Sequence, residues 1–242
     1  LSSCGTRLYI RFANSRRILD IPNARSSHET PTPRGGGLVF VALFLFVCGL
    51  FLILLPDRRD TWIALIGGGN LVAIVGWIDD RSGLSARKRL LAHFIAVGWA
   101  LFWLGGFPTL YLGPGTTLRL GLWGVPLALV GGVWLVNLYN FMDGIDGLAA
   151  GEAVFVSLAA AAIGFVEGDI PLALALFVLV AGIAGFLVWN WSPAKVFMGD
   201  VGSGFLGFVF VVFALTGEKT GSIPALAWGI LLSLFVTDTT MT

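Results

Sequence analysis

The sequence predicts an all-α polytopic membrane protein, a bundle of transmembrane helices. Of its 242 residues, 57% are hydrophobic and only 12% are charged. Soluble domains average about a quarter charged residues, because a water-exposed surface must be largely polar. Apolar stretches of about 20 residues, the length that a helix needs to cross a bilayer, recur along the chain. Lipid offers no hydrogen-bond partners for open strand edges, so we expect each stretch to be helical.

Eight segments have the length and composition of spanning helices. They lie at 38–55, 61–78, 90–106, 121–139, 148–166, 170–189, 203–216 and 222–237. Pro126, Pro171 and Pro224 stand near predicted helix starts, where proline is tolerated. We expect residues 1–242 to form a single integral membrane domain truncated at both ends, because Leu1 is not a start methionine and no polar tail follows the last span.

An eight-span topology assigns the loops alternately to the two sides of the membrane. One side receives 1–37, 79–89, 140–147, 190–202 and the tail from Asp238. The loops of the other side hold only Arg58, Arg59, Arg119 and Lys219, which leaves eleven of the fifteen Lys and Arg for the first side. By the positive-inside rule the first side is predicted to be cytoplasmic. A net charge of +1 indicates no nucleic-acid partner.

Acidic and amide side chains concentrate at the predicted cytoplasmic ends of the helices. They are Asp79, Asp80, Asn140, Asp143, Asp146, Asn190 and Asp200. Groups at the ends of several helices on one face of a bundle can form a single site. Isolated acidic pairs and Asp-Gly turns are also common in solvated helix ends, so each motif alone has an ordinary structural interpretation.

The acidic motifs differ in what their spacing permits. Asp79 and Asp80 are adjacent where a span ends, and such a pair can bind a divalent cation or act as a base. Asp143 and Asp146 are three residues apart, so a helical turn would place them on one side, with Asn140 joining that side.

The segment 190–204 combines amide, aromatic and acidic groups. Asp200 can supply an oxygen ligand and Phe197 a stacking face. The glycines at 202, 204 and 207 spell G-x-G-x-x-G, but no strand precedes them, so we reject dinucleotide binding. Close helix packing is the preferred interpretation of Gly207.

Basic residues near these motifs are phosphate-binding candidates. Arg25 and Arg34 lie in the N-terminal loop, 19–37, in which Gly35–Gly37 could present backbone N–H groups to an anion. Arg87 and Lys88, beside Arg89, begin a span, where they suit either lipid headgroups or a substrate phosphate.

Two further ionisable residues carry weaker signals. His28 is better explained as a surface histidine than as a catalyst. Glu152 lies just inside a span, where ionisable residues are functional candidates by default.

Taken together, three motifs resemble those of the polyprenyl-phosphate N-acetylhexosamine-1-phosphate transferases, glycosyltransferase family 4. They are Asp-Asp after a span, N-x-x-N-x-x-D-G-x-D-G-L at 137–148 and F-M-G-D-x-G-S at 197–203. The resemblance covers residues 18 to 238. The family includes the phospho-MurNAc-pentapeptide transferase of peptidoglycan synthesis and the GlcNAc-1-phosphate transferases of O-antigen and teichoic-acid synthesis.

The resemblance implies a ten- or eleven-helix fold in the bacterial inner membrane with a cytoplasmic active site. It implies transfer of a HexNAc-1-phosphate from a UDP-sugar to undecaprenyl phosphate with release of UMP. Mg²⁺ is the implied cofactor, with Mn²⁺ as an alternative, and a homodimer is suggested by analogy with related proteins.

The resemblance also implies roles for individual residues. Asp200 and Asn140 match metal-side positions, whereas Asp146, Asn190 and Phe197 match positions that hold the uridine. Asp79 and Asp80 match an acidic pair that positions or deprotonates the lipid phosphate, and Asp143 lies beside this catalytic cluster. A lipid monophosphate titrates near neutrality, with a second pKa of about 6 by analogy with phosphorylated side chains, so we favour an orienting role for the pair.

One departure bears on the branch of the family. The peptidoglycan branch shows a lysine before T-P-T-M-G-G, whereas Glu29 precedes T-P-T-P-R-G-G here, which favours the surface-polysaccharide branch. The family's basic or histidine-rich loop after the ninth helix is absent from the sequence. The sequence does not identify the HexNAc.

Three alternative functions compete with this interpretation. The peptidoglycan transferase itself is one alternative. A secondary transporter is another, although transporter sites lie near the midplane and these aspartates lie at helix ends. A CDP-alcohol phosphotransferase would show an arginine that the segment 146–151 lacks.

Overall fold

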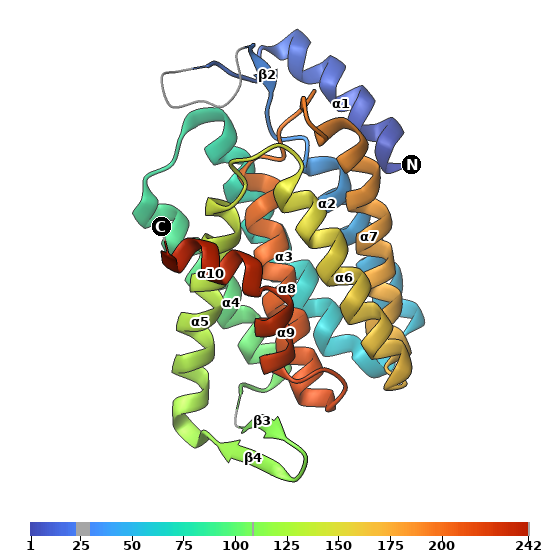
Figure 1. Ribbon diagram of the computed structural model, residues 1–242, viewed down its shortest axis with the longest axis vertical. Helices are drawn as coiled ribbons and strands as arrows, with labels where there is room; N and C mark the ends of the chain where they lie inside the picture. The colour runs from blue at the N-terminus through green and yellow to red at the C-terminus, as the bar shows by residue number, and fades with distance from the viewer. Residues whose placement is uncertain (23–29, 108, 242) are drawn as a thin grey trace.

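The computed structural model describes residues 1–22, 30–107 and 109–241, and these form a bundle of long helices (Figure 1). The long helices are α2 (Leu38–Leu54), α3 (Arg59–Ser82), α4 (Ala86–Leu104), α5 (Gly124–Phe141), α6 (Leu148–Val166), α7 (Ile170–Asn190) and α8 (Asp200–Thr220). Three shorter helices are α1 (Ser2–Arg16), α9 (Ala225–Leu231) and α10 (Ser233–Met241). Single 3₁₀ turns, η1 (Pro56–Arg58) and η2 (Gly121–Trp123), precede α3 and α5.

Two short antiparallel strand pairs mark the two ends of the bundle. β1 (Leu19–Asp20) pairs with β2 (Thr32–Pro33), next to the end of α1. β3 (Thr109–Gly113) and β4 (Thr116–Arg119) form a hairpin between α4 and α5. Figure 1 shows the first pair at the top of the bundle and the second at the bottom, so the two serve as landmarks for its ends.

Helix α8 forms the centre of the bundle. Nearly every residue from Val201 to Gly217 is buried, and α3 and α5 pack along it. A Cβ atom at Gly207 would lie 2.8 Å from the Cα of Val136 and 3.0 Å from the Cβ of Tyr139, both on α5. The interpretation of Gly207 as a close-packing residue is therefore confirmed, since only a glycine leaves room for the facing helix.

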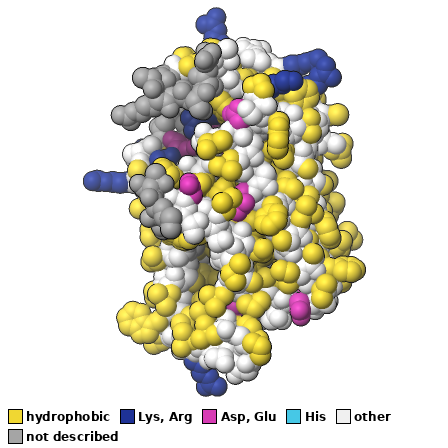
Figure 2. All heavy atoms as spheres, viewed as in Figure 1, with side chains coloured by type: hydrophobic (Ala, Val, Ile, Leu, Met, Phe, Trp, Pro, Cys, Tyr) yellow, Lys and Arg dark blue, Asp and Glu magenta, His cyan; other side chains and the backbone are white. Residues whose placement is uncertain are grey.

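The predicted all-α polytopic class is confirmed. Among the described residues, five helical segments are long and apolar enough to cross a membrane: 56–82, 121–141, 148–166, 170–190 and 200–220. Helix α2 is a shorter apolar helix of 17 residues. Figure 2 shows hydrophobic side chains covering the flank of the bundle, with most Lys and Arg near its two ends. This distribution matches a lipid-facing flank between two aqueous ends.

Residues 1–37 were predicted to be a loop, and this prediction is wrong for the first part. Helix α1 forms there, and it packs on α7 and α2. Its buried face consists of Ser2, Thr6, Tyr9 and Ala13, at helical spacing. Ser2 also donates a hydrogen bond to the carbonyl of Gly182, at 2.6 Å. Hydropathy misses such a helix because small and polar residues make its contact face.

The predicted span at 222–237 is also wrong, because α9 and α10 replace it with a break at Leu232. The two halves pack on different helices. Trp228 of α9 stacks against Phe213 of α8, with ring centroids 6.3 Å apart. Phe235 of α10 lies 5.1 Å from the ring of Tyr139 on α5. Two aromatic anchors on different partners favour a bent segment over one straight helix.

The close contact between α5 and α8 can be tested with one methyl group. Gly207→Ala places a Cβ against the backbone of α5, and overpacking of this kind costs about 1–3 kcal/mol. We expect a lower midpoint of thermal unfolding in detergent. Gly98→Ala on α4 is the matched control, because its Cβ would meet no atom within 4 Å. Equal midpoints for the two variants would contradict the contact.

Candidate active site

The site is built where the end of α3 touches the start of α8. A Cβ at Gly76 would lie 2.5 Å from the carbonyl oxygen of Asp200, and one at Gly199 would lie 2.5 Å from a carboxylate oxygen of Asp80. Gly199 also has a φ of +75°, which side-chain-bearing residues rarely adopt. Glycine at both positions lets the two helix ends meet directly. The acidic pair of α3 is thereby placed against the first residue of α8.

Asp80 binds the backbone at the start of α8. One carboxylate oxygen accepts a hydrogen bond from the N–H of Asp200 at 2.9 Å, and the other accepts one from the N–H of Val201 at 3.1 Å. Arg34 Nε lies 2.8 Å from the same carboxylate. The Asp80 side chain is completely buried. A carboxylate in this position caps the helix and meets the positive end of its dipole.

Two arginines join the remaining carboxylates. Arg89 lies 2.8 Å from Asp79 and 3.0 Å from Asp200, and Arg34 Nη2 lies 3.0 Å from the other oxygen of Asp200. The carboxyl groups of Asp79 and Asp200 lie next to each other, with Arg89 in contact with both. Asp79 additionally accepts a hydrogen bond from the backbone N–H of Leu84. Three acids and two guanidinium groups thus form one network with a formal charge of −1.

The end of α5 and the turn after it contribute two further residues to the site. Asn140 donates a hydrogen bond to the hydroxyl of Ser203 at 2.9 Å, and its amide lies near the Asp200 carboxylate. Asp143, in the turn after α5, lies near the backbone N–H of Gly199. Burial raises the pKa of Asp143 well above its ordinary value, and the charges of Asp200 and Asp80 raise it further.

The three predicted uridine residues lie on two neighbouring loops and at the end of α7, where Asn190 is the last helical residue. Asp146 accepts a hydrogen bond from the N–H of Ala194 at 2.9 Å. Asn190 is buried, accepts from the N–H of Gly147 at 3.2 Å and donates to the carbonyl of Val196 at 3.0 Å. These bonds fasten the 143–147 turn to the 191–199 loop.

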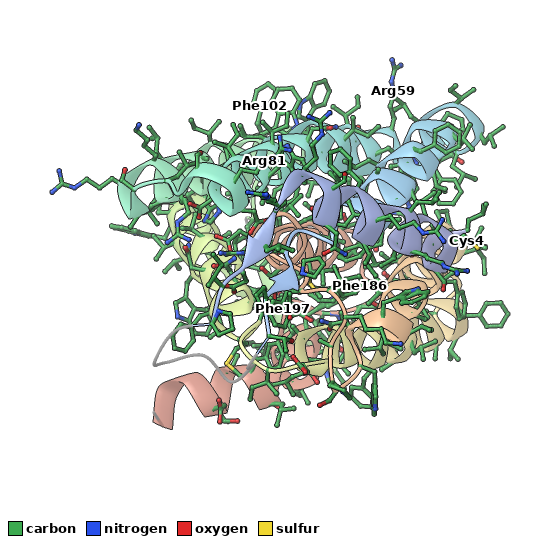
Figure 3. The ribbon with its side chains drawn as sticks, turned by 90° about the horizontal axis from the view of Figure 1, so that it is seen from above. Cys4, Arg59, Arg81, Phe102, Phe186 and Phe197 are labelled. Carbon is green, nitrogen blue, oxygen red and sulfur yellow. The ribbon has the colours of Figure 1, made fainter. Side chains whose placement is uncertain are left out.

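Phe197 lies on the 191–199 loop and touches the N-terminal strands. It is half-buried, and its N–H donates to the carbonyl of Pro33 in β2 at 2.8 Å. Figure 3 looks onto this end of the molecule and labels Phe197 close to the β1–β2 strands. The aromatic ring therefore belongs to the same end of the bundle as the acidic network.

The network contains Arg34 but not the other two predicted phosphate residues. Arg87 and Lys88 are exposed, whereas Arg89, which the sequence analysis did not select, bridges two carboxylates. Helical periodicity is the signal that would have identified it. Arg89 precedes the buried stripe of α4 at the right spacing; that stripe consists of Ala92, His93, Ala96, Val97, Ala100, Leu101 and Leu104.

The suggestion that Gly35–Gly37 offer N–H groups to an anion is wrong for two of the three glycines. The N–H of Gly36 donates to the carbonyl of Phe197, and that of Gly37 donates to the carbonyl of Met198, each at 2.9 Å. These bonds dock the start of α2 onto the loop before α8. The N–H groups of Gly36 and Gly37 are thus used by the fold, and the side chain of Arg34 is the part of this segment that joins the ionic network.

Other residues singled out in the sequence stand apart from the network. Glu152 is buried in α6, and its Oε1 atom has no hydrogen-bond partner. Arg25, His28 and Glu29 lie outside the residues that the structure describes.

The donor set at this end fits a hard cation. Among the described residues, no three His, Cys, Asp or Glu side chains form a ready-made metal cage. Mg²⁺ does not need one, because it takes one or two protein oxygens and fills its octahedron with phosphate and water. Asp200 and Asn140, in contact with each other, offer carboxylate and amide oxygens of that kind.

The fold and the site define a class of protein. It is a helical membrane protein with a network of ion pairs at one end of the bundle. Within that class, residues 62–218 match the model of glycosyl transferase family 4. This chain belongs to that family, and it is a multi-pass membrane protein.

Curated relatives support the same assignment. The chain is 38% identical, over 81% of its length and 58% of the relative, to the phospho-N-acetylmuramoyl-pentapeptide-transferase of Synechococcus sp. (strain JA-3-3Ab). It is 34% identical, over 88% of its length and 59% of the relative, to the probable undecaprenyl-phosphate N-acetylglucosaminyl 1-phosphate transferase of Bacillus subtilis (strain 168). The decaprenyl-phosphate N-acetylglucosaminephosphotransferase of Mycobacterium tuberculosis (strain ATCC 25618 / H37Rv) is 33% identical, over 86% of this chain and 55% of the relative. The chain thus spans little more than half the length of these relatives.

The fastening of the two loops by Asn190 predicts a local stability effect. Asn190→Ala leaves the Gly147 N–H and the Val196 carbonyl without these partners, at a cost of about 1–3 kcal/mol. We expect tryptic cleavage after the exposed Lys195 to become at least about tenfold faster, because local opening becomes more populated. Asn70→Ala on the exposed face of α3 is the control. Equal cleavage rates for both variants would show that Asn190 does not hold the loop.

Proposed function

We propose that the protein containing this chain transfers a HexNAc-1-phosphate from a UDP-sugar to undecaprenyl phosphate. A lipid phosphate oxygen bonds to the sugar-proximal phosphorus, the bond between the two phosphates of the donor breaks, and UMP leaves. The single observation that supports this best is the meeting of Asp79, Asp200 and Asn140 with Arg34 and Arg89 at one end of the bundle.

The two arginines suit the charge of the reactants. Both substrates carry phosphates, and their approach requires cations that offset the repulsion. Arg34 is held by Asp80 and Arg89 by Asp79, so each stays anchored when its second contact, to Asp200, is given up. A guanidinium group presents several donors in a fixed plane, which matches phosphate oxygens. Phosphoryl transfer depends mainly on such positioning and charge compensation.

The remaining site residues take roles that fit their places. Asp200 and Asn140 would hold Mg²⁺, or Mn²⁺ as an alternative, and a bound ion would neutralise charge on the phosphates. The acidic pair Asp79 and Asp80 would orient the lipid phosphate, with Asp143 beside the cluster. An orienting role suits the pair better than proton abstraction, since a lipid monophosphate has lost most of its second proton at neutral pH.

In the proposal, the nucleotide and the lipid contact different parts of the site. Phe197 would stack on the uracil ring, with Asp146 and Asn190 bonded to the backbone of the same 191–199 loop. Arg87 and Lys88, exposed at the start of α4, would meet lipid headgroups or the lipid phosphate. The eleven Lys and Arg on this side of the predicted topology favour a cytoplasmic site in a bacterial inner membrane.

The branch of the family to which the protein belongs is a separate proposal. Glu29, where the peptidoglycan branch has lysine, favours synthesis of O-antigen or another cell-envelope polysaccharide. The 38% identity to a phospho-N-acetylmuramoyl-pentapeptide-transferase favours the second candidate, the peptidoglycan reaction. A homodimer remains part of the proposal by analogy with related proteins.

A donor panel tests the proposal and its alternatives together. Membranes containing the full-length protein are incubated with undecaprenyl phosphate and UDP-GlcNAc, UDP-GalNAc, 6-deoxy UDP-HexNAc sugars or UDP-MurNAc-pentapeptide. We expect UMP release and a lipid-diphospho-HexNAc with at least one simple UDP-HexNAc. Turnover with the pentapeptide donor alone would establish the second candidate. Uptake of a substrate into vesicles without UMP formation would instead indicate a transporter.

Asp200 is the residue whose loss should be most severe. Asp200→Asn removes the charge that both arginines and the proposed cation share, so we expect UMP release to fall by at least about a thousandfold. The backbone N–H that Asp80 binds is retained, so the thermal midpoint should fall only slightly. Release of UMP at the unmutated rate would remove Asp200 from the site.

A further inference from the structure

The two carboxylates of the acidic pair have different surroundings. Asp80 contacts the backbone of Asp200 and Val201, whereas Asp79 contacts the carboxylate of Asp200. The Asp80 side chain has no exposed surface, while Asp79 retains 8%. Two carboxylates in contact repel each other unless a cation or proton lies between them. Arg89 lies between Asp79 and Asp200 and offsets that repulsion. Asp79 thus borders Asp200, where the proposed function places the charged reactants, whereas the oxygens of Asp80 face the protein.

Asp80 also occupies backbone N–H groups with which the start of α8 could bind an anion. The first N–H groups of a helix have no partner within the helix and commonly bind phosphate. Here the N–H groups of Asp200 and Val201 donate to Asp80. Those of Gly202 and Ser203 donate to the carbonyl of Gly199, at 2.9 and 3.0 Å. A substrate phosphate at this end must therefore be bound by other groups, of which the side-chain cations Arg34 and Arg89 belong to the network.

Arg34 is the cation that Asp80 directs. Its carbonyl accepts a hydrogen bond from the hydroxyl of Tyr9 at 2.6 Å, and its N–H donates to the carbonyl of Ile18 at 3.2 Å, so its backbone is fixed. The side chain is then held at Nε by Asp80, while Nη2 reaches Asp200. The side chain is 35% exposed although its partner Asp80 is fully buried. The outer end of the guanidinium is thus presented at the site from a buried anchor.

We infer that Asp80 is a positioning residue, which caps α8 and aims Arg34 at the diphosphate of the donor, and that Asp79 is the member of the pair that meets the reacting phosphates. This inference rests on the proposed function. It accounts for an adjacent acidic pair in which one carboxylate is fully engaged in the fold and the other borders Asp200.

A double-mutant cycle tests the link between Asp80 and Arg34. The variants Asp80→Asn, Arg34→Gln and the double mutant are made in the full-length protein, and the Kd for UDP is measured in the presence of Mg²⁺. We expect each single change to weaken UDP binding about tenfold or more, because Asp80→Asn weakens the charged hydrogen bond that holds the guanidinium and Arg34→Gln removes the guanidinium. In the Arg34→Gln background, Asp80→Asn should add less than about twofold.

Asp79→Asn serves as the matched control. Its effect on UDP affinity should be as large in the Arg34→Gln background as alone, and it should lower kcat more than it changes KM for the UDP-sugar. Asp80→Asn should show the opposite split, a raised KM with a smaller loss of kcat. Effects of Asp80→Asn that multiply with those of Arg34→Gln would overturn the inference. A collapse of kcat at unchanged KM and Kd would do so too.

Two further outcomes remain informative. Should Asp80→Asn fail to fold, Arg34→Lys tests the same link, since it keeps the charge but lacks the Nε donor. UDP affinity as low as in Arg34→Gln would support the inference, and unmutated affinity would refute it. An unmutated protein without turnover on any donor would overturn the proposed function, whereas the UDP-binding cycle would still decide the role of Asp80.

Discussion

The end of α3 and the start of α8 meet with no space for a side chain between them, and one carboxylate closes the contact. Asp80 neutralises the positive end of α8, satisfies two of its backbone donors and holds Arg34. Gly76 and Gly199 make this approach sterically feasible. This contact between the helix ends sets the position of Asp200, the first residue of α8. Asn140 bonds to Ser203 of α8 and Arg89 to Asp79, so their positions follow from the same contact.

Charge balance explains why so many ionic groups are tolerated beside a bilayer. A buried charge without a partner costs several kcal/mol, so buried acids are found paired. Here three carboxylates share two guanidinium groups, and backbone donors take up further lone pairs. The arginines therefore stabilise the site when no substrate is bound. The same cations are available to phosphates once Asp200 has another partner, so the resting network and the proposed binding site use one set of side chains.

The sequence predicted the convergence of the site better than it predicted individual contacts. Counting spans places Asp79, Asn140 and Asp200 on one face, because topology alternates whatever the details of packing. Arg89 was missed because a run of three cations suggests headgroup contact, and only the buried stripe of α4 shows which cation faces inward. The helix α1 and the break at Leu232 depend on long-range packing, against α7 in one case and against α5 and α8 in the other. No local pattern reports such contacts.

The central place of α8 shields the site from the membrane itself. Bilayers differ in thickness, and helices that face lipid respond by tilting. Helix α8 is surrounded by protein along almost its whole length, so its neighbours absorb such adjustments first. Asp200 is the first residue of this buried helix. The spacing between the charged groups of the site is therefore expected to be largely independent of the lipid composition around the protein.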